Sequence, residues 1–353
     1  MGETRVPMTR ALGMGALPTF VEEGAGHRQL QRLFERQQLP FSVIDNREMR
    51  MPFAAMQELF EHAARVLGDR TFGLRVGQQM THTGYGLWGR YLASAPTLEG
   101  AIRRATETLW VYQSGSTTSL TRHGGHALWR YRPAVVAGSD ATQHSDHVLP
   151  TMLTLTRFYL GAKWLPDWYE LDYKRDPDAG LVEDWLDRDV TFGAPALGIA
   201  IRADQLATRR PPVTMSEPMP SRGAVIAALA PRGQNDSLGA VKDVITLRLL
   251  DGQTDLEGAA QLIGRGPRSL QADLSRAGTS YRALLEAARL ERGAALLQDS
   301  QESVTRIAIE LGYHDEGEAL LRRMRGVDSH RVLALLLLAE VAINRQEPWA
   351  EDI

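Results

Sequence analysis

Apolar residues in the first half of the chain recur with helical spacing in several stretches. In Glu58–Leu67 they repeat at spacings of three and four, and the run stops at Gly68, which predicts a helix. A second helix is expected over Thr97–Tyr112, because Thr97 is a suitable N-cap residue for the run that follows it. The same pattern predicts a third helix over His144–Trp164.

Other stretches have the composition of strands. Thr117–Arg122 and Ala127–Tyr131 flank Gly124 and its neighbouring glycine, which predicts a β-hairpin. Trp168–Tyr173 and Gly198–Arg202 are short runs rich in β-branched, aromatic and apolar residues and are expected to be strands. Helices and strands together predict an α+β N-terminal domain.

Composition shifts divide the rest of the chain. Residues 1–20 are rich in Gly, Thr and Met and are expected to be disordered. The α+β domain is assigned to residues 21–210, and residues 211–238 are expected to be a linker because they contain four prolines in their first ten positions. An all-α domain is expected over residues 239–330, followed by an atypical tail at 331–353.

Two helix-turn-helix patterns lie in the last third of the chain. Asp255–Leu274 and Ser303–Arg323 each begin with a short helix that has one apolar face, continue through a glycine and a few turn residues, and end in a second helix. The glycines, Gly264 and Gly312, are 48 positions apart, and a helix is expected between the units over Ser280–Leu297. A single such pattern is often a plain helical hairpin, whereas a tandem pair is typical of DNA-reading domains.

The first unit has local features that suit this fold. Asp255 can cap its first helix, Gly264 can supply the positive φ that ends it, and Pro267 suits the first turn of the next helix after Gly266. The helix between the units has about 18 residues and therefore spans roughly 27 Å. That length could place two recognition helices in successive major-groove segments, about 34 Å apart.

Arginine and glutamine are standard readers of guanine and adenine, and serine can bind a phosphate or a base. The candidate DNA-binding residues are therefore the polar or small side chains on or beside the two second helices: Arg265, Arg268, Ser269, Gln271, Ala272, Ser275, Arg276, His314, Arg322 and Arg323.

Charge and composition narrow the possibilities. The chain has a net charge of −3, and residues 255–331 contain 11 arginines against 12 acidic residues, so bulk charge predicts no strong salt-driven affinity for DNA. The absence of cysteine excludes disulfides and thiolate metal sites. With no apolar run of about 20 residues and no signal-peptide pattern, a cytoplasmic protein without membrane contact is expected.

The motifs resemble a known family. The first unit is similar to the first helix-turn-helix of AraC/XylS-type transcription regulators, through the pattern Ala260-x-x-Ile263-Gly264-x-x-x-Arg268-Ser-Leu-Gln271. Arg289–Leu297 resembles their linker helix, and Val304–Tyr313 resembles the start of their second unit. Gly73–Gly77 and Gly84–Leu98 resemble the arabinose-binding-like N-terminal domain of one subgroup.

This resemblance implies a DNA-binding transcription regulator whose N-terminal domain binds a small-molecule effector and forms a homodimer. The implied partners are double-stranded DNA, the effector and RNA polymerase, with no cofactor. The effector, the operator and the choice between activation and repression stay open.

Aromatic residues with a few polar anchors could line an effector pocket, although most aromatic side chains in such a domain are core residues. The candidates are Trp88, Arg90, Trp110, Tyr112, Trp129, Tyr131 and Arg157. The pairs His123/His126 and His144/His147 have no convincing further ligands, so no metal site is predicted.

Two alternatives remain. After Tyr313 the chain departs from the family pattern, because the expected aromatic residues are missing from Ala319–His330. A protein-interaction module with a degenerate second helix-turn-helix and weak DNA binding is therefore a second hypothesis. An enzyme is not expected, because no nucleophile–base pair, phosphate loop or nucleophile elbow is found.

Overall fold

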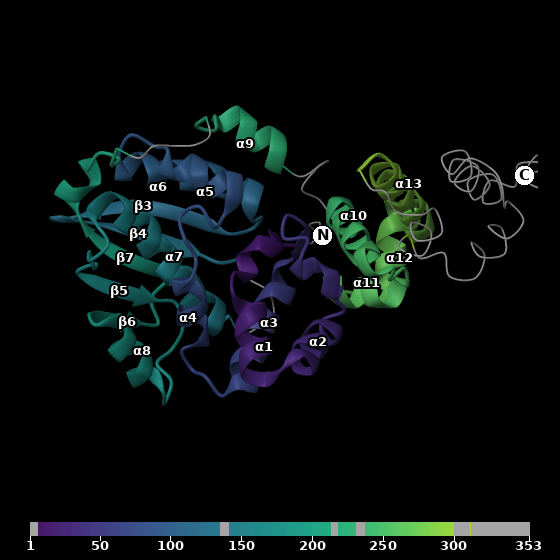
Figure 1. The fold of residues 1–353 in the computed structure, drawn as a ribbon, viewed down its shortest axis with the longest axis horizontal. Coiled ribbons are helices and arrows are strands. Elements are labelled where there is room, and N and C mark those ends of the chain that lie inside the picture. The colour runs from purple at the N-terminus through teal and green to yellow at the C-terminus, as the bar shows by residue number, and fades with distance from the viewer. Residues whose placement is uncertain (1–5, 135–140, 213–217, 231–236, 300–310, 312–353) are drawn as a thin grey trace, which may run out of the picture. The chain divides into compact units, whose positions relative to one another are not determined.

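A computed structural model describes residues 6–134, 141–212, 218–230, 237–299 and Leu311 (Figure 1). The chain divides into two compact units. Unit 1 consists of residues 1–37 and 46–236, and unit 2 consists of residues 38–45 and 237–353.

Unit 1 is built on a five-stranded sheet with the order β3-β4-β7-β5-β6. β3 (Thr117–His123) and β4 (His126–Arg132) form the predicted hairpin, and β4 pairs antiparallel with β7 (Leu197–Arg202). β5 (Trp168–Leu171) pairs antiparallel with β7 and parallel with β6 (Asp189–Phe192). The central strand β7 lies between β4 and β5 and is buried over its first five residues, of which Leu197, Ile199 and Ile201 belong to the apolar core.

Helices surround this sheet. In unit 1 they are α1 (Leu17–Ala25), α2 (His27–Arg36), α3 (Phe53–Leu67), α4 (Phe72–Gln78), α5 (Gly86–Ala93), α6 (Leu98–Tyr112), α7 (Thr142–Leu160), α8 (Ala179–Leu186) and α9 (Arg222–Leu229). α6 packs on β3, while α7 contacts β7 as well as α3 and α4, so it lies between the sheet and these two helices (Figure 1). The main apolar core joins side chains of α5, α6 and α7 to those of the sheet.

The predicted elements of unit 1 are largely confirmed. The helices at 58–67, 97–112 and 144–164 correspond to α3, α6 and α7, and the strands at 168–173 and 198–202 correspond to β5 and β7. Thr97 caps α6 as predicted, since its hydroxyl accepts the backbone N–H of Gly100 at 3.2 Å. An α+β N-terminal domain is therefore the observed fold.

α4 crosses α7 at unusually short range. A Cβ at Gly73 would lie 2.1 Å from the carbonyl oxygen of Gln143, and one at Gly77 would lie 2.3 Å from that of His147. The Gly73–Gly77 motif thus has a packing role, because only glycine lets the two backbones approach this closely.

Residues 6–20 are ordered, in contrast to the prediction of disorder over residues 1–20, of which residues 1–5 fall outside the described residues. Met8–Arg10 form β1, which pairs antiparallel with β2 (Arg50–Pro52), and Met14 and Leu17 are fully buried. The partners that order this segment lie about 40 residues away, so its local composition did not indicate them.

The predicted linker 211–238 also needs correction, because α9 lies inside it. Ser221 caps α9 by accepting the backbone N–H of Ala224 at 3.1 Å. Val225 and Leu229 belong to the apolar core of unit 1, and the buried guanidinium of Arg10 donates to the carbonyl oxygen of Leu229 at 2.9 Å. The prolines before α9 favoured the prediction of a linker, whereas the short helix depends on packing partners that are distant in sequence.

Every described element of unit 2 is helical. These are α10 (Ser237–Arg248), α11 (Leu256–Ile263), α12 (Pro267–Arg276) and α13 (Tyr281–Asp299), with short 3-10 helices at Phe41–Ile44 and Leu249–Asp251. The predicted helical C-terminal domain is confirmed to this extent. The second helix-turn-helix pattern and the tail 331–353 fall outside the described residues, so those predictions stay predictions. Among the described helices, none has both the length and the apolar character that crossing a bilayer requires.

Candidate functional site

α11 and α12 occupy the first of the two predicted DNA-reading patterns. The carboxylate of Asp255 caps α11 by accepting the backbone N–H of Gly258 at 2.7 Å. α11 ends at Gly264, whose φ of +74° lies in the left-handed region that favours glycine. Gly266 is the N-cap of α12 and Pro267 its first residue, where a missing N–H does no harm. The structure has each of these local features as the sequence predicts.

A buried arginine fixes the start of α11. Arg248 is 1% exposed, and its guanidinium donates to both the backbone carbonyl and the carboxylate of Asp255, at 2.7 and 2.8 Å. Partial burial alone raises the pKa of Asp255, but the bonds from Gly258 and Arg248 outweigh it and lower that pKa. A Cβ at Gly258 would lie 2.2 Å from the guanidinium, so this position admits only glycine without a rearrangement.

α12 has one buried side and one exposed side. Leu270 and Leu274 are each 3% exposed and hold the helix against its unit. Arg268 forms no ion pair with any described residue, Arg276 pairs with Asp273, and Arg265 in the preceding turn is partly exposed. The exposed candidate DNA-binding residues are Arg268, Ser269, Gln271, Ala272, Ser275 and Arg276. His314, Arg322 and Arg323 lie outside the described residues.

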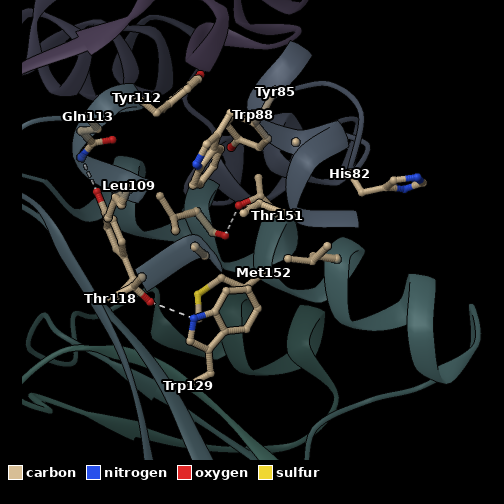
Figure 2. Close-up of a pocket in the computed structure, with 16 residues that line it drawn as sticks. His82, Tyr85, Trp88, Leu109, Tyr112, Gln113, Thr118, Trp129, Thr151 and Met152 are labelled. Carbon is tan, nitrogen blue, oxygen red and sulfur yellow. Dashed lines mark hydrogen bonds between the residues drawn. The ribbon is translucent and has the colours of Figure 1, made fainter. Parts of the chain in front are cut away.

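A second candidate site is a cavity of about 700 Å³ in unit 1, part of it open to solvent (Figure 2). Its walls come from the turn before α5, from α5, α6 and α7, and from the β3–β4 hairpin. The lining residues are His82, Tyr85, Trp88, Gly89, Leu92, Ala105, Leu109, Tyr112, Gln113, Thr118, Trp129, Tyr131, Val148, Thr151, Met152 and Leu155.

Polar atoms around the cavity bond mostly to one another. The indole N–H of Trp129 donates to the hydroxyl of Thr118 at 2.8 Å, and the amide of Gln113 donates to the hydroxyl of Tyr131 at 2.5 Å (Figure 2). Thr151 donates to a backbone carbonyl of its own helix at 2.6 Å. The donors of Trp129, Gln113 and Thr151 are therefore engaged within the protein, whereas the hydroxyl of Tyr112 is buried without a hydrogen-bond partner among the described residues.

The lining also carries no charge near neutral pH. It contains no Asp, Glu, Lys or Arg. Burial raises the pKa of Tyr85 to about 12 and the pKa values of Tyr112 and Tyr131 further, so these phenols stay protonated. Burial lowers the pKa of His82 below its usual 6.5, so its imidazole is neutral at pH 7.

The predicted pocket residues separate into two groups. Trp88, Tyr112, Trp129 and Tyr131 line the cavity, and the rings of Trp88 and Tyr112 stack with centroids 5.1 Å apart. This group combines residues from α5, α6 and β4 that are up to 43 positions apart, from Trp88 to Tyr131.

The remaining three do not line it. Arg90 and Trp110 each lie two positions from a lining residue on the same helix, which turns their side chains to another side of that helix. Trp110 is 41% exposed. Arg157 donates to the backbone carbonyl of Trp164 at 2.9 Å, away from the cavity.

The sequence reasoning missed much of the lining, although helical spacing contained a signal. Val148, Thr151, Met152 and Leu155 recur on α7 at spacings of three and four, as do Ala105, Leu109 and Tyr112 on α6. Such a stripe equally describes a core face, and which stripes border empty space depends on the packing of the other elements.

The chain is similar to known proteins. Residues 28–209, more than half of the 353-residue chain, match the family described as the arabinose-binding domain of AraC transcription regulators, N-terminal. The ornithine utilization regulator of Pseudomonas aeruginosa is 24% identical over 290 residues, which cover 81% of this chain and 84% of that protein. The crystal structure of the transcriptional regulator CdpR from Pseudomonas aeruginosa aligns with 17% identity and a TM-score of 0.39, over 86% of this chain and 96% of that one.

The chain belongs to the AraC family of transcription regulators, through its arabinose-binding-type N-terminal domain. It is accordingly a regulator and not an enzyme.

Proposed function

We propose that the protein is a sequence-specific, DNA-binding transcription regulator that responds to a small molecule bound in the cavity of unit 1. The observation that carries the proposal is the exposed face of α12, where Arg268, Gln271 and Ser275 stand on one helix above two buried leucines. These are side-chain types that read base edges and phosphates in the major groove. The short turn after α11 supports the comparison with a recognition helix.

The partners follow from family membership. Double-stranded DNA, a second copy of the chain and RNA polymerase are the partners we propose, and the small-molecule effector is the signal. The name of the relative concerns ornithine utilization and the family description names arabinose. Both compounds are therefore natural comparisons in any search for the effector of this chain.

Genomic-fragment binding by the purified protein at two salt concentrations tests the proposal. A discrete motif with two half-sites about one helical turn apart, bound more weakly at the higher salt, is the expected result. A single short half-site would mean that only α12 reads DNA. No enrichment, with or without cell extract as a source of effector, would contradict DNA binding and favour the protein-interaction module.

A further inference from the structure

The cavity in unit 1 has a chemistry that restricts what it can bind. Its walls combine several aromatic rings with aliphatic side chains and contain no formally charged residue. Its empty volume is about 700 Å³, a figure that includes space open to solvent. The question is which ligands can leave water for such a site.

We propose that this cavity takes a neutral, mainly apolar ligand with a flat or aromatic body and at most one or two uncharged hydrogen-bonding groups. The inference rests on the proposed role of the cavity as the effector site and deepens it by naming the class of effector.

Charged ligands are excluded by desolvation. An ion that leaves water for a low-dielectric site needs an opposite charge or several hydrogen bonds to offset the lost hydration. The lining has no acidic or basic side chain to pair with it. His82 and Tyr85, which could ionise, are held neutral at pH 7 by their burial.

Polyhydroxyl ligands are disfavoured for a related reason. Each buried hydroxyl needs a partner, and an unpaired one weakens binding. The side-chain donors of Trp129 and Gln113 already bond to Thr118 and Tyr131. If these donors bonded to a ligand instead, hydrogen bonds within the protein would be lost. A sugar would therefore leave several of its hydroxyls without a partner.

Aromatic walls favour a flat ligand. Trp88 and Trp129 present large apolar surfaces on opposite sides of the lining, and Met152 lies next to Trp129 (Figure 2). Aromatic and thioether groups contact ring systems well, through offset or edge-on arrangements. The same two tryptophans give a built-in fluorescence signal for occupancy.

The test uses the full-length protein and a matched set of probes. N-phenylnaphthylamine, which is neutral and fluoresces in apolar surroundings, reports occupancy directly. Competitors with one shared ring system are neutral naphthalenemethanol, anionic naphthoate and cationic naphthylmethylammonium; a free pentose and a basic amino acid complete the set. We expect the neutral competitor to bind at least about 100-fold more tightly than either ion, since each tenfold step reflects about 1.4 kcal/mol.

A filling variant locates the site. Ala105→Phe on α6 places a ring in the cavity, whereas Thr106→Phe adds the same ring at the exposed neighbouring position. Loss of at least tenfold in probe affinity for the first variant and little change for the second is expected. Ala105→Val, a smaller addition, replaces the first variant if melting curves show that it does not fold.

Three results would overturn the inference. These are tighter binding of an ion, the pentose or the amino acid than of the neutral competitor, equal probe affinity in the two phenylalanine variants, and no binding of any compound. DNA binding is measured separately without any probe, so these failures leave the proposed regulator function distinguishable from the proposed ligand class.

Discussion

The cavity of unit 1 and the exposed face of α12 in unit 2 use opposite chemistry. The cavity is lined by aromatic and aliphatic side chains, and the polar atoms of Trp129 and Gln113 bond to Thr118 and Tyr131 in the same lining. The α12 face presents Arg268 and Gln271 to solvent, and Arg268 forms no ion pair with any described residue. The first arrangement suits a neutral molecule that leaves water, and the second suits the wet, charged surface of a nucleic acid.

The two regions also depend differently on the rest of the chain. α11, α12 and their turn lie within Asp255–Arg276, so a short stretch of sequence is enough to recognise them. The cavity collects residues between His82 and Leu155 from three helices and a hairpin. Changes that disturb one region without the other therefore test whether this division is correct.

The largest expected effect concerns the cap of α11. Asp255→Ala removes the cap and leaves the buried guanidinium of Arg248 without its carboxylate. The carboxylate is 54% exposed, so the free energy of unfolding of unit 2 should fall by about 2–4 kcal/mol, for a lost cap and an unsatisfied buried donor. Hydrogen exchange of α11 and α12 measures this loss. Probe binding in the cavity should persist, because unit 1 supplies its entire lining.

Asp273→Ala is the matched control for this prediction. It removes a carboxylate from an arginine whose side chain is 76% exposed, instead of 2% as for Arg248. Its effect should stay below about 1 kcal/mol, as for other surface pairs. Equal effects of the two variants would contradict the stabilising role assigned to the bond between Asp255 and the buried Arg248.

The next effect concerns the scaffold that holds α7 beside the cavity. Gly77→Ala puts a methyl group 2.3 Å from the carbonyl oxygen of His147, so the helices must separate and unit 1 should lose about 1–3 kcal/mol. Urea denaturation followed by tryptophan fluorescence measures the change.

Gly180→Ala is the control, because Gly180 lies on α8 with open space around it. The stability of this variant should equal that of the wild type or exceed it by up to about 1 kcal/mol. A Gly77→Ala protein as stable as the wild type would refute the close-contact argument.

Arg268→Ala tests the DNA-reading role of the α12 face. If Arg268 reads a base, its removal should weaken binding to the selected site by about 1–3 kcal/mol and relax specificity at one position. Binding to randomised sites, followed by sequencing, measures both quantities. Arg282→Ala is the control, because Arg282 lies on α13 and pairs with Glu286. Unchanged site selection by the Arg268 variant would remove this residue from the reading set.

The last prediction is a pH dependence of the stability of unit 1, in which each pH unit has a small effect. His144 packs edge-on against Phe53 and lies near Tyr131 of the cavity wall, and burial lowers its pKa to about 3. Below its usual pKa of about 6.5 the unfolded chain binds a proton that the folded chain does not. The stability from the neutral ring is therefore present above that pH and is lost as the pH falls toward 3, by on the order of 1 kcal/mol per pH unit.

Denaturation curves between pH 7 and pH 4 for the wild type and His144→Phe measure this loss as a difference, in which titrating groups that do not interact with His144 cancel. The wild type should lose more stability than the variant as the pH falls. His123→Phe, at an exposed position, should follow the wild type. Parallel curves for the wild type and His144→Phe would show that the folded protein accommodates the charged ring.

Local sequence alone determined the α6 cap at Thr97, the β3–β4 hairpin around Gly124, and the turn at Gly264. Each of these depends on a few neighbouring residues, through a side-chain cap, a favoured turn or a permitted φ, so no distant partner is needed to predict them.

Tertiary structure decided what long-range packing controls. β1 needs β2 about 40 residues away, and α9 needs the core of unit 1, so neither could be read from its own composition. The same holds for the cavity, because the sequence could nominate Trp88 and Trp129 but not exclude Trp110 or supply Thr151. A residue borders empty space only when every surrounding element leaves it unfilled, and that outcome is a property of the assembled fold.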